Sequence, residues 1–354
     1  MARPPKETDS RELVSFDYRA PGDTVPAWGR ELIEAQLAID AEDAAQAGQL
    51  GFMARAMVIA TMPHKDPKLQ TFFRKNGNFS LRMTAGAGGG IPYGIYPRLL
   101  MSWVTTEAVR RRDRTIVIDE SMGWFIKNVL GVSASTGGRA GSLTRITEQM
   151  KRLFGAMITA EYELDTKRYS LQNVVLADSL QLDKREMSQL WNTKGPKTIQ
   201  GAKPATKPEN AHALWTPQRA EDAGKWFSHI ELSQRFFDEI IERPVPIDLR
   251  AYTALRKSPL AMDVYTWLTF RNSYATRKTR AIQWESLQWQ MGSGYAFTDQ
   301  GTRDFKKAFL KALQAAHVVY PQANFEVADK GLVLLPSATS VKQKRVKANQ
   351  QALF

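Results

Sequence analysis

Two segments of the sequence combine an apolar stripe with a basic face. Residues 142–154 and 302–316 each repeat apolar side chains at helical spacing. The opposite faces carry Thr144, Arg145, Glu148, Lys151 and Arg152 in the first segment, and Thr302, Arg303, Lys306, Lys307, Lys311 and Gln314 in the second. Arginine can donate two hydrogen bonds to a guanine edge, at about 1–3 kcal/mol of discrimination, while lysine and threonine suit phosphates. The pattern therefore predicts two DNA-binding helices, although the solvated faces of ordinary amphipathic helices would look the same.

Further basic residues stand in the connections and hairpin tips around these segments. They are Arg139, Lys167, Arg168, Arg277, Lys278, Arg280 and Lys330. Across the whole set we expect base readout from Arg139, Arg145, Arg303 and Lys307, and phosphate or minor-groove contacts from the others. Lysines at hairpin tips can also serve solubility alone, so both interpretations of the tips stay open.

Residue patterns for catalysis are missing from the sequence. There is no Gly-x-x-x-x-Gly-Lys-Ser/Thr phosphate loop, and the four histidines stand apart from one another. The carboxylates at 119–120 and 161–165 are explained by a strand end and an exposed hairpin. We therefore expect no enzyme activity, no catalytic residue, no metal and no cofactor.

The charge balance points to a polyanionic partner. The 354 residues include 49 Lys+Arg against 36 Asp+Glu, which gives a net charge of +13. Such an excess favours nucleic acid or an acidic membrane surface. No cysteine and no long apolar run is present, so we expect a cytoplasmic protein, associated with the nucleoid or a plasmid, without membrane spans.

The elements that would position the basic faces occur in the same order twice. The first run has a helix at 93–111, a β segment at 115–119, a helix from about 121, the helix 142–154 and a hairpin at 156–164 and 169–177; the second has helices at 259–271, 284–291 and 299–316 and a hairpin at 324–327 and 331–335. A helix-turn-helix followed by a two-stranded wing is the winged-helix arrangement. The predicted fold is α+β, with two tandem winged-helix domains.

Composition shifts suggest the domain boundaries. We expect an N-terminal arm and helix at 1–49, a first domain at 50–240 with a flexible loop at 192–215, a second domain at 245–335 and a basic disordered tail at 336–354. Aromatic residues on the helix stripes are the expected core: Trp103, Trp124, Tyr265, Trp267 and Phe270.

Four blocks of sequence resemble the plasmid-encoded RepA replication initiators. The blocks are 91–103, 137–154, 236–248 and 258–271, within a match over about 50–335. The resemblance implies tandem winged helices that bind directly repeated double-stranded origin sites (iterons). It also implies opening of the adjacent duplex, recruitment of the host initiator and replicative helicase, plasmid copy control, and a monomer–dimer equilibrium in which dimers repress the protein's own promoter.

Three other functions remain compatible with the residues alone. They are a winged-helix transcriptional repressor without initiator activity, a DNA-nicking replication enzyme, and an adaptor whose basic charge is incidental.

Overall fold

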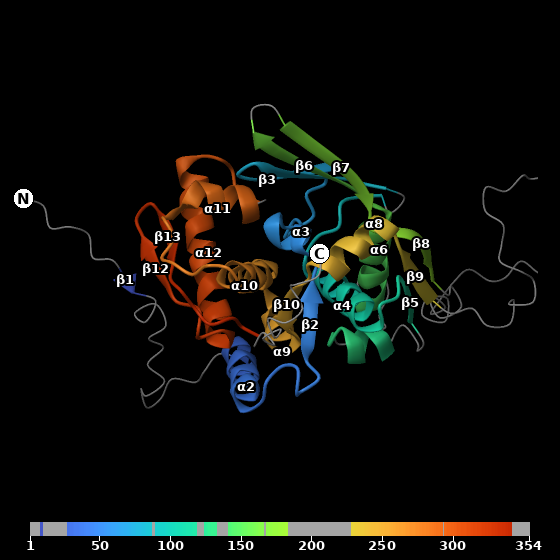
Figure 1. The fold of residues 1–354 in the computed structure, drawn as a ribbon, viewed down its shortest axis with the longest axis horizontal. Coiled ribbons are helices and arrows are strands. Elements are labelled where there is room, and N and C mark those ends of the chain that lie inside the picture. The colour runs from blue at the N-terminus through green and yellow to red at the C-terminus, as the bar shows by residue number, and fades with distance from the viewer. Residues whose placement is uncertain are drawn as a thin grey trace, which may run out of the picture.

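The structure is a computed structural model that describes residues 8–9, 27–86, 89–118, 124–132, 141–165, 168–182, 228–292 and 294–341. Helices and four small sheets form an α+β fold with two winged-helix units, one in each half of the chain (Figure 1). Arg139, Lys167, the predicted loop at 192–215 and most of the predicted tail lie outside the described residues.

The C-terminal unit is a winged helix in the predicted order. It comprises α10 (Pro259–Asn272), β11 (Ile282–Gln283), α11 (Trp284–Met291), α12 (Asp299–Val319), β12 (Phe325–Ala328) and β13 (Gly331–Leu334). β13 lies between β11 and β12 and is antiparallel to both, so the hairpin forms a wing beside the helix-turn-helix. In the N-terminal arm, β1 (Thr8–Asp9) pairs with the outer edge of β12.

Hydroxyl caps define where α10 and α12 begin. Ser258 Oγ accepts the amide of Ala261 at 3.2 Å, and Pro259 occupies the first turn, where its missing N–H costs nothing. Thr298 Oγ1 accepts the amide of Gly301 at 3.1 Å at the start of α12. Each cap satisfies an amide that has no partner inside its helix.

The cap at Ser258 can be tested by replacement with alanine. Loss of the hydroxyl leaves the Ala261 amide unpaired, so Ser258→Ala should lower the free energy of unfolding by about 1 kcal/mol. Urea denaturation measures this difference. Ser286 is exposed on α11 and serves as the control, since Ser286→Ala should change stability by less than about 0.5 kcal/mol. Equal effects of the two changes would contradict the capping role.

The N-terminal unit has the same order with two additions. It comprises α4 (Ile95–Arg111), β5 (Thr115–Ile118), the π-helix η1 (Phe125–Val129), α6 (Ser142–Gly155), β6 (Met157–Asp165), β7 (Arg168–Val175) and β8 (Ala177–Gln181). A hairpin of β3 (Thr71–Asn76) and β4 (Phe79–Thr84) extends the wing in the order β3-β4-β6-β7. β9 (Ser228–Leu232) lies between β5 and β8. The wing of this unit is therefore part of a four-stranded sheet (Figure 1).

Seven further elements of the described part of the chain lie outside the two winged-helix units and join them. They are α2 (Ala27–Ala41), β2 (Leu50–Met53), α3 (Arg55–Ile59), α8 (Gln234–Glu242), β10 (Val245–Asp248), α9 (Leu249–Ala254) and the 3-10 turn η4 (Leu255–Lys257). β10 pairs with β2 in antiparallel register, across the predicted boundary at 240–245. The buried side chains of the described residues form one continuous hydrophobic cluster through both units. The division into two domains stays a prediction.

Four of the five predicted core aromatics pack into or against this cluster. Tyr265 and Trp267 are buried, and Trp103 and Phe270 pack against the cluster from its edge. The prediction for Trp124 was wrong, because its side chain is 47% exposed. The π-helix that follows turns Phe125 inward instead, and its ring meets Trp103 edge-on at 4.5 Å. The wider π turn shifts which residues face the core, so a stripe counted at α-helical spacing does not apply here.

Candidate nucleic-acid interface

The outer face of α12 presents the predicted base-reading residues. Phe305 and Phe309 are fully buried on the inner face. Arg303 and Lys307 are exposed on the opposite side, one turn apart. Gln300 Oε1 accepts the Arg303 Nη2 donor at 3.0 Å, which holds the guanidinium near the first turn of the helix. Arg303 and Lys307 therefore point away from the core in the N-terminal half of α12. In winged-helix proteins this end of the third helix lies in the major groove.

The wing turn lies next to this face. Trp284, at the start of α11, donates its Nε1–H to the carbonyl of Asp329 at 3.0 Å. Lys306 Nζ lies 4.9 Å from the centroid of the same indole ring. Lys330 is exposed in the turn itself. The structure therefore brings the wing turn and the basic side of α12 together through one tryptophan.

The basic connection before β11 lies at the other end of the hairpin. Thr279 donates its amide to Leu334 at 2.9 Å, whereas Gln283 pairs with Gly331 beside the turn. Gly331 and Leu334 are three residues apart on β13, so at about 3.3 Å per residue these two ends of the hairpin are roughly 10 Å apart. Arg277, Lys278 and Arg280 are exposed at the far end, where Lys278 Nζ forms an ion pair with Glu326 Oε2 at 2.6 Å.

Thr302 holds α12 against α11. Its hydroxyl donates to Gln288 Oε1 at 2.9 Å, and Gln288 is fully buried and also donates to the carbonyl of Ala296 at 2.9 Å. The pair fixes the turn of the helix-turn-helix. Sequence reasoning assigned Thr302 to DNA and missed Gln288, which no periodic pattern marks.

The α6 helix has the predicted burial pattern but a less basic outer face. Ile146, Met150 and Leu153 are buried, whereas Arg145 and Lys151 are exposed with Glu148 between them. Thr144, at the start of this face, is partly buried. Arg168 begins β7, and its side chain is outside the described residues.

Arg152, which the sequence predicts as a phosphate contact, makes several contacts within the protein. Its side chain is only 13% exposed and forms ion pairs with Glu148 at 2.5 Å and Asp66 at 3.7 Å. The guanidinium also lies 5.4 Å from the ring centroid of Tyr93. These contacts involve both terminal nitrogens of the guanidinium, and the ion pair with Asp66 fastens α6 to a preceding loop.

A buried charge network joins the first helices of both units. Arg98 of α4 donates from Nε and Nη2 to the carboxylate of Asp263 on α10, at 2.7 and 2.6 Å. It also donates to the carbonyls of Met62 and Pro63, at 2.6 and 3.1 Å. His64 Nε2 lies 2.8 Å from the same carboxylate. Burial opposes ionisation of Asp263, but Arg98 and His64 hold its pKa below the ordinary value.

This network predicts a pH-dependent stability. Burial lowers the pKa of His64 below its ordinary value of 6.5, despite the hydrogen bond to Asp263. The His64 ring therefore binds a proton more readily in the unfolded chain than in the folded one. The folded state has its full stabilisation above pH 6.5 and loses it as the pH falls below that value. Urea denaturation should show a free energy of unfolding that declines from pH 7 to pH 5, and less steeply in His64→Gln. Parallel pH curves for the two proteins would contradict this.

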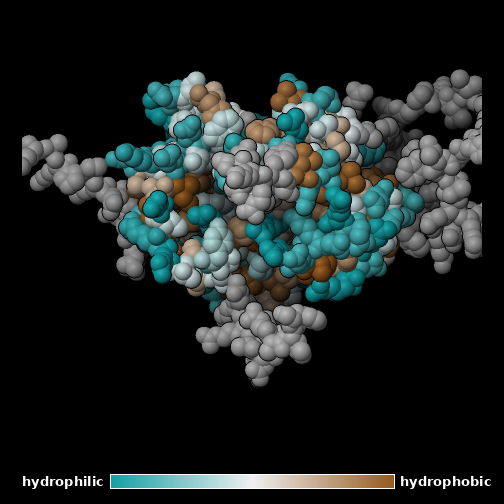
Figure 2. Space-filling view, turned by 45° about the horizontal axis from the view of Figure 1, so that its top comes forward, coloured by the Kyte–Doolittle hydropathy of each residue, from teal (hydrophilic) through white to brown (hydrophobic). Residues whose placement is uncertain are grey.

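Hydrophilic side chains dominate the face of the molecule seen in Figure 2. Figure 2 shows hydrophobic residues as separate patches within a largely hydrophilic face. None of the described helices is long and apolar enough to cross a bilayer. In the same part of the chain, no three histidine or carboxylate side chains come together as a metal site.

Comparison with known proteins identifies the family of this chain. No curated protein matches the chain. A crystal structure of domains 2 and 3 of RctB is similar at a TM-score of 0.45 and 10% identity, covering 80% of this chain and 97% of that one. The family model of the plasmid-encoded RepA protein matches residues 91–189 and 181–290, which together span more than half of the chain. The chain belongs to the plasmid-encoded RepA family of replication initiators.

Proposed function

We propose that this protein initiates plasmid replication by binding double-stranded repeats at the origin, with α12 as the main reading helix. The observation that carries the proposal is the exposed pair Arg303 and Lys307 on the third helix of a complete winged helix. Lys330 in the adjacent wing turn can hold the neighbouring backbone. In this proposal Arg303 and Lys307 contact the bases, and Lys330 contacts a phosphate.

The second reading helix is α6. Arg145 and Lys151 are exposed on its outer face, and Glu148 between them can accept a hydrogen bond from a cytosine amino group. Arg139, which lies outside the described residues, remains a proposed base contact. Arg277, Lys278 and Arg280 extend the phosphate contacts at the base of the second wing.

Binding to the plasmid's own origin tests the proposal. Electrophoretic shifts of the full chain should show tighter binding to an origin repeat than to a shuffled duplex of the same length. The logarithm of the binding constant should fall linearly with the logarithm of salt concentration, by about 0.9 per phosphate contact. Equal affinity for both duplexes at every salt concentration would overturn the sequence-specific role.

Later steps of initiation belong to the same proposal. Bound protein opens the adjacent duplex and recruits the host initiator and replicative helicase, while dimers in equilibrium with monomers repress its promoter and set plasmid copy number. These steps place the protein in the cytoplasm, with the nucleoid or plasmid. The resemblance to RepA initiators supports them. A plain repressor of the same fold would bind the origin but fail to replicate an origin plasmid in a host that supplies the protein in trans.

We also propose that the protein acts without a catalytic step of its own. Incubation of supercoiled origin DNA with the protein and Mg²⁺ should leave the DNA unnicked. The appearance of nicked circles that depend on the protein would show that it is an enzyme.

A further inference from the structure

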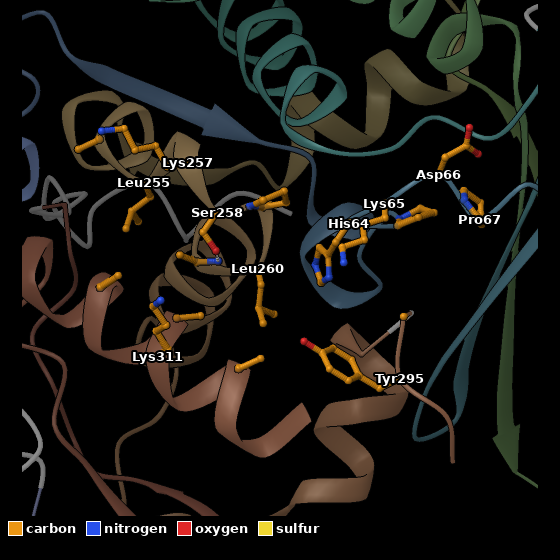
Figure 3. Close-up of a pocket in the computed structure, with 18 of the residues that line it drawn as sticks. His64, Lys65, Asp66, Pro67, Leu255, Lys257, Ser258, Leu260, Tyr295 and Lys311 are labelled. Atoms are coloured by element: carbon orange, nitrogen blue, oxygen red, sulfur yellow. Dashed lines mark hydrogen bonds between the residues drawn. The ribbon is translucent and has the colours of Figure 1, made fainter. Parts of the chain in front are cut away.

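One loop lies between the two reading helices. Residues 63–68, which we name the junction loop, run between α3 and β3. On one side the loop lines a cavity of about 590 Å³ together with Lys311 and Ala308 of α12. On the other side Asp66 Oδ2 lies 3.7 Å from Arg152 Nη1 of α6. Figure 3 shows His64 and Lys65 of the loop on one side of the cavity and Lys311 and Tyr295 on the other.

Buried groups hold the junction loop in place. Arg98 binds the carbonyl of Pro63, and Asp263 binds the ring of His64 at 2.8 Å. Further along, Asp66 Oδ1 accepts the amide of Lys68 at 2.9 Å. Since Arg98 and Asp263 belong to the first helices of the two winged-helix units, the loop keeps a defined position relative to both.

The junction loop presents positive charge to solvent. Lys65 and Lys68 are exposed, and so is Lys311 across the cavity. The one carboxylate of the loop, Asp66, is already paired with Arg152. Lys68 has φ +52°, a left-handed conformation that is uncommon for lysine and is supported here by the hydrogen bond from its amide to Asp66.

We propose that Lys65 and Lys68, together with Lys311, bind the DNA phosphates between the two grooves read by α6 and α12. The inference rests on the proposed function. Two reading helices in successive major grooves are about 34 Å apart, and the backbones of the intervening minor groove face whatever joins them. The junction loop contacts α6 through Asp66 and shares a cavity with α12, and its exposed lysines supply the cations that this backbone requires.

Charge removal on the loop tests the inference. The Lys65→Gln/Lys68→Gln variant should weaken binding to an origin repeat and to a shuffled duplex by the same factor. Its salt slope should be less steep by about 1.8, at 0.9 per lost phosphate contact. Ethylation interference identifies the phosphates whose modification blocks binding. The interference should disappear at the phosphates between the two major grooves read by α6 and α12, and persist at the phosphates within those grooves.

Two controls separate the possible outcomes. Lys75→Gln/Lys127→Gln removes the same charge from exposed lysines of β3 and η1, and should leave the central interference intact. Lys65→Arg/Lys68→Arg keeps the charge and should bind like wild type. An unchanged salt slope and interference pattern in Lys65→Gln/Lys68→Gln would overturn the inference while the proposed function stands. Failure of wild type to prefer the origin repeat would instead overturn the proposed function.

Discussion

Replacement of Asp263 by asparagine is expected to lower the free energy of unfolding by about 3–5 kcal/mol. The carboxylate binds two donors of Arg98, whose side chain is 2% exposed. Asparagine keeps the volume but removes the charge, and leaves a guanidinium in the core without its counter-ion. Loss of one member of a buried ion pair costs far more than the pair contributes, because the remaining charge stays desolvated. Urea denaturation at pH 7 measures the difference.

A double variant distinguishes the charge effect from a packing effect. Removal of both charges in Arg98→Met/Asp263→Leu leaves no uncompensated ion, so much of the lost stability should return. Asp329 is exposed in the wing turn, and Asp329→Asn should change stability by less than about 0.5 kcal/mol. A cost below 1 kcal/mol for Asp263→Asn would show that the network contributes little to folding.

Local patterns predicted the positions of α6 and α12 well. The sequence predicts helices over 142–154 and 299–316, and the structure has α6 at Ser142–Gly155 and α12 at Asp299–Val319. Both predictions depend on residues only a few positions apart, where apolar spacing acts directly. The two hairpins were predicted for the same reason.

Contacts between distant residues could not be predicted in this way. Arg98 and Asp263 are 165 positions apart, and the Asp66 partner of Arg152 is on a different element. From sequence alone Arg152 was one more cation on a helix face, whereas the fold gives it two carboxylates. Asp263 in the apolar run 259–270 and Arg98 in the apolar run 95–104 are visible in the sequence, but nothing there indicates that they are partners. The four-residue strands β2 and β10 are too short for a periodic signal.

The C-terminal winged-helix unit offers the sharper test of DNA base recognition. On α6 a glutamate stands between the two exposed cations, whereas Arg303 and Lys307 stand on α12 beside the wing turn. Trp284 and the Thr302–Gln288 pair fix that geometry through buried contacts. A helix held in this way needs less ordering on binding, and we expect substitutions on its outer face to change base preference.

Replacement of Arg303 and Lys307 by alanine should remove most of the preference for the origin repeat. Arg303→Ala alone should relax discrimination at one base pair by about 1–3 kcal/mol, a 5- to 150-fold effect. Competition shifts with repeats altered one base pair at a time measure it. As a control, Arg235→Ala removes an exposed cation from α8 and should leave the base preference unchanged. If Arg303→Ala instead lowered the affinity equally for all sequences, Arg303 would be a phosphate contact. If Arg303→Ala/Lys307→Ala bound the repeat with wild-type affinity, α12 would not be the reading helix, and Arg145 on α6 would have to carry the specificity.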